Sequence, residues 1–214
     1  MKYLSIIILV FVLFTSVACN SSTDAKSENE TEEHVVVKKA YSLDTINSII
    51  NWTRNVDYKH ITKQVFLFGA YVDVTMDNVQ YETTGEIFPT EGFLNTEDDV
   101  IISGQINLDL SLTRFYSDEE EQFFVNDEYP TAVLSFIEIK SDSSNNYTVI
   151  AEFIMDDSQI QLEFPAVIEK LDDSYKMNAE IIIQASSLPI LNQPDPENVN
   201  LDEIRFVLNL VYSF

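Results

Sequence analysis

The chain has 214 residues, and its 36 acidic residues against 12 basic ones give a net charge of −24. Nucleic-acid binding requires clustered Lys and Arg that replace phosphate counterions, so this balance argues against a nucleic-acid partner and against direct docking on anionic lipid headgroups. The acid excess is typical of a soluble surface; a weak calcium site is the alternative, although no EF-hand spacing accompanies it.

Residues 1–18 are predicted to be a lipoprotein signal peptide. Lys2 precedes a run, Leu4 to Phe14, that is apolar apart from Ser5 and too short to span a bilayer, which needs about 20 apolar residues. Small residues follow and end at Cys19, the only cysteine of the chain. The arrangement resembles the lipobox of bacterial lipoproteins, with Ser16 at a position that usually holds Leu. The alternative is an ordinary secretory signal followed by an accidental cysteine.

The lipobox resemblance implies a location and an attachment. In lipoproteins the cysteine thiol is acylated by a diacylglycerol and becomes the first residue of the mature chain. Cys19 is therefore the predicted lipidation site, carrying acyl chains such as palmitate that anchor the protein to a membrane. We expect a lipid-anchored protein of the bacterial cell envelope, on the outer membrane, either periplasmic or surface-exposed.

Two segments follow the signal. Residues 19–40 are predicted to be an acidic, flexible tether, because Asn20 to His34 contains no strongly apolar residue and cannot offset its ordering entropy by burial. Residues 41–214 form the predicted folded domain. A chain of that length buries roughly 70% of its unfolded surface as one domain, so no second domain is required.

Alternating apolar and polar residues predict strands through most of this domain. Four stretches alternate clearly, as half-buried strands do: 100–112, 158–168, 175–183 and 204–214. Shorter or continuous apolar runs predict four more strands, at 48–54, 65–75, 133–140 and 147–154. Polar turn signals at 96–99, 141–146, 156–157 and 171–174 favour an antiparallel meander.

Two further features complete the predicted fold. Pro165 lacks a backbone donor, so its strand is expected to have an edge or a bulge there. Ser117 to Glu120 has capping-box spacing and predicts one short helix that ends before Tyr129-Pro130. The fold class is therefore all-β, an antiparallel barrel of about eight strands with one short helix between strands, because closure removes exposed sheet edges.

The sequence offers little for catalysis, and we predict that the protein is not an enzyme. Cys19 is used by the anchor, and His34 and His60 are the only imidazoles. No Gly-x-Ser-x-Gly elbow is present, and four glycines in the chain leave no Gly-rich phosphate loop. No catalytic residue, metal ligand or cofactor is predicted. A hydrolase that uses His60 with acidic residues is a remote alternative.

Several motifs resemble the YceI-like family. Tyr41 to Asp44, followed by Ser48 to Trp52, resembles its opening strand. Phe123 to Phe136 (FFVNDEYPTAVLSF) resembles its most distinctive stretch, in which a short helix ends in Phe-Phe before Tyr-Pro-Thr and a strand. Leu108 to Arg114 lies where the family has a strand ending in Ser-x-x-Thr.

The resemblance implies a lipocalin-like barrel whose interior holds a long isoprenoid or another amphiphilic chain. Two family elements are replaced in this chain. Residues 151–160 read AEFIMDDSQI where the family has Gly-x-Leu-x-x-x-Gly-x-Thr-Lys, and residues 185–190 read ASSLPI in place of Arg-x-x-Phe-Gly. The family's charged headgroup contacts therefore do not carry over.

Two functions follow from a barrel rich in aromatics, which include 14 Phe and 10 Tyr. The first is a membrane-anchored protein that binds an apolar or isoprenoid chain inside a hollow barrel. The second is an envelope or surface interaction protein, or a stress protein, whose barrel is filled. The residues predicted to line a ligand are Trp52, Leu108, Leu110, Phe124, Phe136, Phe153, Phe164, Phe206 and Leu208. Phe123 and Phe124 are alternatively expected to plug the barrel mouth.

Overall fold

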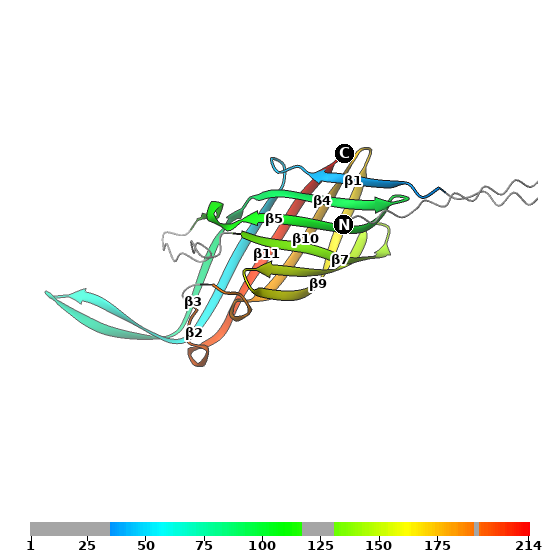
Figure 1. Cartoon of the computed structure of the whole chain (residues 1–214). Helices are drawn as coiled ribbons and strands as arrows, with labels where there is room; N and C mark the ends of the chain where they lie inside the picture. The colour runs from blue at the N-terminus through cyan, green and yellow to red at the C-terminus, as the bar shows by residue number, and fades with distance from the viewer. Residues whose placement is uncertain (1–34, 117–130, 191–192) are drawn as a thin grey trace, which may run out of the picture. The chain divides into compact units, whose positions relative to one another are not determined.

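A computed structural model describes residues 35–116, 131–190 and 193–214, and within them residues Val36–Phe214 belong to one compact unit. The elements of this unit are antiparallel strands and short 3-10 turns (Figure 1). In chain order they are β1 (Lys38–Leu43), β2 (Ile49–Leu67), β3 (Ala70–Ile87), β4 (Pro89–Glu97), β5 (Val100–Asp109), η1 (Leu110–Leu112), β6 (Arg114–Phe115), β7 (Thr131–Ser143), β8 (Asn146–Met155), β9 (Ser158–Leu171), β10 (Ser174–Gln184), η2 (Ala185–Ser187), η3 (Pro196–Asn198) and β11 (Val199–Ser213).

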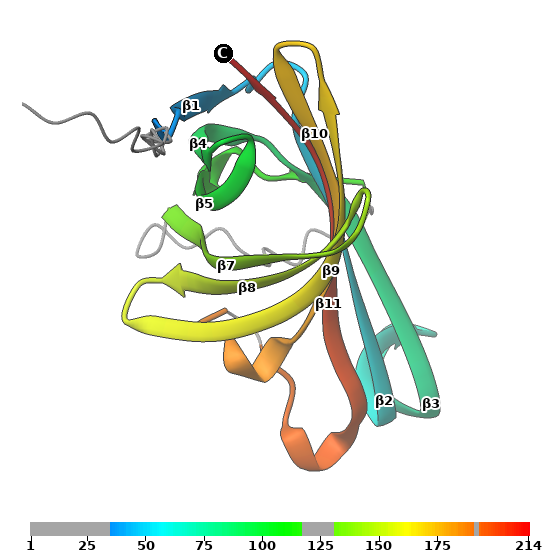
Figure 2. The ribbon, with the colours of Figure 1, turned by 90° about the vertical axis from the view of Figure 1, so that its right-hand side faces the viewer.

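The predicted all-β class is confirmed, as a closed antiparallel, lipocalin-like barrel. The sheet runs β1-β4-β5-β7-β8-β9-β10-β11, and a pairing of β1 with β11 closes the ring (Figure 2). That closure is short, with two residue pairs, Ser42↔Ser213 and Leu43↔Tyr212. The Ser48 hydroxyl strengthens it, because it accepts a bond of 2.9 Å from the Val211 amide.

The inward face of the barrel follows from the alternation in the sequence. In β10 every odd-numbered residue from Tyr175 to Ile183 is buried and the residues between them face solvent, as predicted. β11 behaves in the same way from Ile204 to Tyr212. These side chains join those of the other strands in one apolar core inside the ring.

Two alternation details were wrong. Ile102 was predicted to face inward, but it is exposed and Ile101 is buried instead. The cause is a register shift opposite Asn95 and Thr96, which adds one residue to β5 and reverses its phase. Phe214 was also placed on the apolar face, yet it is largely exposed at the end of β11.

Other boundaries also differ from the predictions. Residues 65–75 are not one strand but a hairpin, because Phe68 and Gly69 adopt positive φ angles of 54° and 88° and reverse the chain. The folded region begins before residue 41, since β1 starts at Lys38, which pairs with Glu97. The predicted helix after Ser117 lies outside the described residues.

Aromatic rings pack at the end of the barrel where β1 begins. The rings of Tyr41 and Tyr175 meet edge to face at 4.9 Å, and Phe214 lies 5.8 Å from Tyr41. Burial and neighbouring groups raise the pKa of Tyr175 to about 12. Tyr212 of β11 pairs with Tyr175 of β10 and is fully buried. Desolvation raises the pKa of its hydroxyl. We call this the closed end of the barrel, and both tyrosine hydroxyls stay uncharged there at neutral pH.

Candidate functional site

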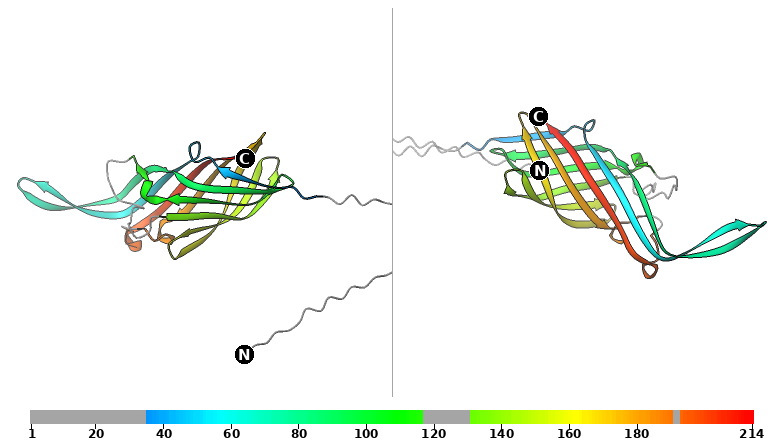
Figure 3. Two further views of the ribbon diagram at one scale, coloured as in Figure 1. Left: turned by 45° about the horizontal axis from the view of Figure 1, so that its top comes forward. Right: turned by 180° about the vertical axis from the view of Figure 1, so that it is seen from behind.

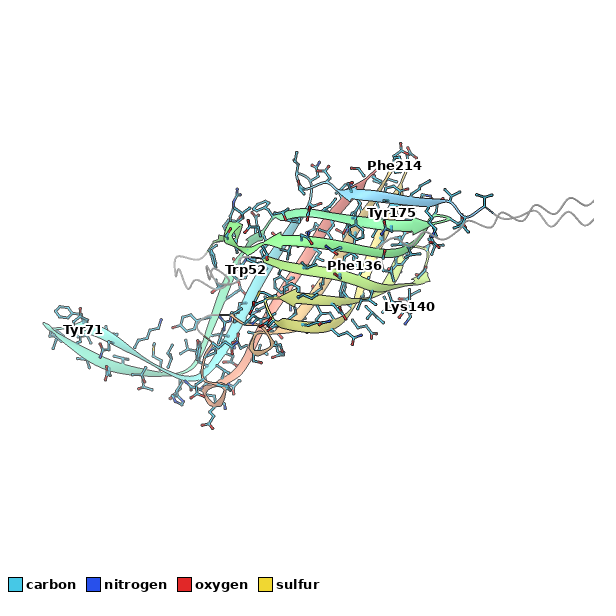
Figure 4. The ribbon with its side chains drawn as sticks, in the orientation of Figure 1. Trp52, Tyr71, Phe136, Lys140, Tyr175 and Phe214 are labelled. Carbon is cyan, nitrogen blue, oxygen red and sulfur yellow. The ribbon has the colours of Figure 1, made fainter. Side chains whose placement is uncertain are left out.

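The barrel interior is the candidate site, and most of the predicted lining residues lie in it. Eight of the nine are buried in the core, and Phe124 lies outside the described residues. Figure 4 shows two of them, Trp52 and Phe136, on the strands of the barrel wall. Leu108, Phe153, Phe206 and Leu208 also line a common cavity, whereas the other four pack elsewhere in the core.

The cavity is small and entirely apolar. Its volume is about 20 Å³, which is room for roughly one water molecule. It is lined by Ile50, Leu108, Leu134, Phe153, Leu162, Ile181, Ile183, Phe206 and Leu208. Five of these residues, from β2, β7, β9 and β10, were not predicted to line a ligand. They lie on the inward face of their strands, so the alternation of apolar and polar residues could have identified them.

The cavity lies beside a gap in the barrel wall between β9 and β10. These two strands pair from Leu171↔Ser174 to Ala166↔Ala179 and no further. β9 nevertheless continues back to Ser158 and β10 continues to Gln184. Figure 2 shows β7, β8 and β9 curving to one side while β10 and β11 stand upright.

Pro165 is the residue at which this ladder ends. The Ile168 amide donates to the Asn145 carbonyl at 2.9 Å, on the β8 side of the strand. Because backbone groups alternate along a strand, the missing donor of Pro165 is on the opposite side, facing β10. Pro165 therefore cannot donate the hydrogen bond that would extend the ladder to Glu180. This agrees with the edge or bulge that the sequence predicted at Pro165.

A shallow apolar groove lies on the outer side of the same gap. Its volume is about 460 Å³, and it is lined by residues of β7 to β11 that include Pro165, Ala179, Glu180 and Leu208. Leu208 contributes to both the groove and the inner cavity. Ala179, whose side chain is small, pairs with Leu208 at this point.

The chain that follows β10 lies over the gap between β9 and β10. η2 lies beside the unpaired part of β9 in both Figure 1 and Figure 2. Leu188 and Ile190, which follow it, are buried in the core. The Gln193 side-chain amide donates to the Leu188 carbonyl at 2.7 Å and holds this segment in place. Residues 185–190 thus form part of a cover, named here the 185–190 cover.

A buried ion pair lies on the inner face of the barrel, between β2 and β11. Arg54 follows the inward phase of Ile50 and Trp52, and its guanidinium donates two bonds, of 2.6 and 2.7 Å, to the Asp202 carboxylate of β11. Sequence reasoning missed this pair. The period-two phase of β2 placed Arg54 inward, which could have identified it.

A second cluster of charges joins strands at the closed end. Asp99, in the β4–β5 turn, lies 2.7 Å from the Lys170 ammonium of β9 and 3.4 Å from that of Lys39 in β1. The hydrogen bond from Lys170 is the main cause of a lowered pKa for the Asp99 carboxyl. The cluster is solvent-exposed and links the closing strand to the barrel.

The described residues include His60, which the remote hydrolase alternative requires. Among them, no group of three or more His, Cys, Asp or Glu side chains could hold a metal ion. His60 is exposed on β2, and its amide donates to the Asn198 side chain at 3.2 Å. No helix within the described ranges is long and apolar enough to cross a membrane.

Comparisons with known proteins give a structural likeness only. No protein-family model matches the chain, and no curated protein matches it. The crystal structure of Burkholderia cenocepacia BcnA superposes with a TM-score of 0.49 and 14% sequence identity, covering 79% of this chain and 98% of BcnA. No residue role is transferred at this level of similarity.

The buried ion pair yields a stability prediction. Asp202→Ala removes the Asp202 carboxylate from the buried Arg54 guanidinium, and we expect it to lower the free energy of unfolding by about 3–5 kcal/mol. Arg54→Met combined with Asp202→Leu should restore most of that loss. Urea unfolding followed by circular dichroism measures both.

An exposed pair provides the control. Glu138→Ala breaks the surface contact of 3.0 Å with Lys140 and should change the free energy of unfolding by less than about 1 kcal/mol. Equal losses for Asp202→Ala and Glu138→Ala would contradict the assigned role of the buried pair.

Proposed function

We propose that the barrel binds an apolar chain, an isoprenoid or fatty-acyl lipid, through the gap between β9 and β10. The observation that carries the proposal is an apolar inner cavity and an apolar outer groove that share Leu208 at the point where Pro165 ends the ladder. The YceI-like motifs of the sequence support the same ligand class.

Burial alone provides the binding energy in this proposal. Each methylene transferred from water to the apolar interior contributes about 0.8 kcal/mol. The described inner face offers one cation, the Arg54 guanidinium, and Asp202 already neutralises it. The proposed ligand is therefore an apolar chain, and its head group contributes little.

Binding requires the interior to open. A cavity of about 20 Å³ does not accommodate a chain of several carbons. Leu188 and Ile190 of the 185–190 cover occupy core positions without belonging to a strand, so their withdrawal enlarges the interior and leaves the barrel ladder intact. We propose that the ligand displaces these two side chains.

The ligand proposal predicts a thermal shift that one substitution abolishes. Farnesol or geranylgeraniol should raise the melting temperature of the wild type, since a ligand at 100 times its Kd adds about 2.7 kcal/mol of stability. Leu162→Trp places an indole in the cavity and should abolish the shift. Ile160→Trp is the matched control, because Ile160 is also half-buried on β9 but does not line the cavity.

Lipid extraction of protein purified from its own host completes this test. A co-purifying isoprenoid or fatty-acyl chain is expected. Its absence, together with no thermal shift from either alcohol, contradicts ligand binding.

The size of the cavity favours a second function. A barrel packed around about 20 Å³ of free volume acts as a rigid scaffold, in which case the protein is an envelope interaction protein without an internal ligand. This function is favoured if lipid extraction yields no co-purifying chain and neither alcohol raises the melting temperature.

We also propose that Cys19 is acylated and anchors the protein to the envelope. Growth of the host with an alkyne-labelled palmitate should label the wild-type protein, and Cys19→Ser should remove the label and release the protein into the soluble fraction. Labelling that persists in Cys19→Ser would contradict the proposed anchor.

A further inference from the structure

The β2–β3 hairpin extends beyond the barrel as a two-stranded arm. β2 pairs with β11 only as far as Tyr58, and β3 pairs with β6 only at Gly85 and Glu86. Among the described residues, no third strand therefore pairs with residues 59–78, and Figure 3 shows this arm clear of the barrel in both views. Ten residues per strand give it a length of about 30 Å.

The base of the arm is braced and bent. The Asn198 side chain of η3 accepts from the His60 amide and donates to the His60 carbonyl at 2.6 Å, so it takes the place of a neighbouring strand. Lys59 donates to the Glu197 carbonyl at 2.7 Å. Asn78 has a φ angle of 54°, which interrupts β3 at the same level. These contacts fix the direction of the arm.

The tip of the arm is apolar and exposed. Phe68 occupies the turn with its side chain fully exposed, at a positive φ angle that glycine or asparagine would adopt with less strain. Phe66 and Tyr71 pair across the hairpin with ring centroids 5.1 Å apart, and they are 60% and 72% exposed. Figure 4 shows Tyr71 at the far end of the arm.

Charge is absent from this tip. No residue from Gln64 to Val72 is charged, which gives an uncharged depth of about 14 Å. Asp73 lies just behind it on β3. The Lys63 ammonium lies 4.7 Å from the ring centroid of Tyr81, so the side chain is directed toward the barrel.

We propose that this tip, residues 64–72, inserts into the interfacial layer of a zwitterionic lipid bilayer. Both faces of the hairpin are apolar, because Phe66 and Tyr71 share one face while Val65 and Val72 pair on the other. A protein surface covers one face of a flat hairpin, whereas lipid surrounds both. Interfacial segments reach about 5–10 Å into the headgroup boundary, which the uncharged tip spans.

Two further features define the lipid and the depth. The net charge of −24 opposes approach to anionic headgroups, so the partner is a phosphatidylcholine- or phosphatidylethanolamine-like surface. The outer edges of the two strands carry unpaired backbone groups, which keeps the tip out of the hydrocarbon core. Pairing of these edges with a second copy is the rival, but it would leave Phe68, at the turn itself, exposed.

The test uses the full chain carrying Cys19→Ser, so that no acyl anchor contributes, with phosphatidylcholine vesicles. Trp52 is buried and serves as a constant background. Phe68→Trp should give a blue-shifted emission that lipid-borne bromine quenches. Ile46→Trp, at an exposed position in the β1–β2 turn, should show neither effect. This result does not depend on an internal ligand.

Removal of apolar surface provides the second measurement. Phe66→Ser together with Phe68→Ser should lower the vesicle partition coefficient at least about tenfold, with Ile46→Ser as the control. An unshifted Phe68→Trp emission overturns the proposal. It is also overturned if binding requires anionic lipid, or if the double variant instead converts a dimer to a monomer in sedimentation.

Discussion

The interruption of the β9–β10 ladder at Pro165 is the constraint on which the candidate site depends. A closed barrel normally satisfies each backbone donor and acceptor by pairing with both neighbours. Here one proline lacks the donor that faces β10, and the two strands separate for the rest of their length. The barrel is therefore continuous at the end where β1 begins and open along one wall beyond Ala166 and Ala179.

The rest of the site follows from this separation. Leu162 remains half-buried because no strand covers it on the β10 side, and the chain after β10 supplies Leu188 and Ile190 to the core. Side chains from a connecting segment can leave a core at lower cost than strand residues, because no ladder bonds break. The same geometry therefore explains the packed interior and supports the proposed route of opening.

The sequence predicted the barrel well and the site only in part. Alternation in β10, and in β11 as far as Tyr212, placed each inward residue correctly, because burial of one face fixes the phase of a strand. It failed at Ile102, where an extra residue reverses the phase, and at residues 65–75, where an apolar turn was taken for a strand. Arg54 was missed because a buried cation depends on its partner, Asp202, which lies far away in the sequence.

Ligand-lining residues illustrate the same limit. Leu108, Phe153, Phe206 and Leu208 were predicted from burial and line the cavity. Trp52 was predicted on equal grounds but packs against Phe115, with ring centroids 5.4 Å apart. Period-two patterning indicates which residues face inward, but the position of the gap along the axis depends on strand pairing, which the pattern does not contain.

Amide hydrogen exchange measured residue by residue tests the opening of the wall most directly. The amides of Gln159, Gln161 and Glu163 face the gap, whereas those of Val167 and Glu169 face β10 within the ladder. The account predicts rapid exchange for the first three and strong protection for the last two, although all five belong to one strand. Equal protection along β9 would contradict it, because the ladder would then continue past Pro165.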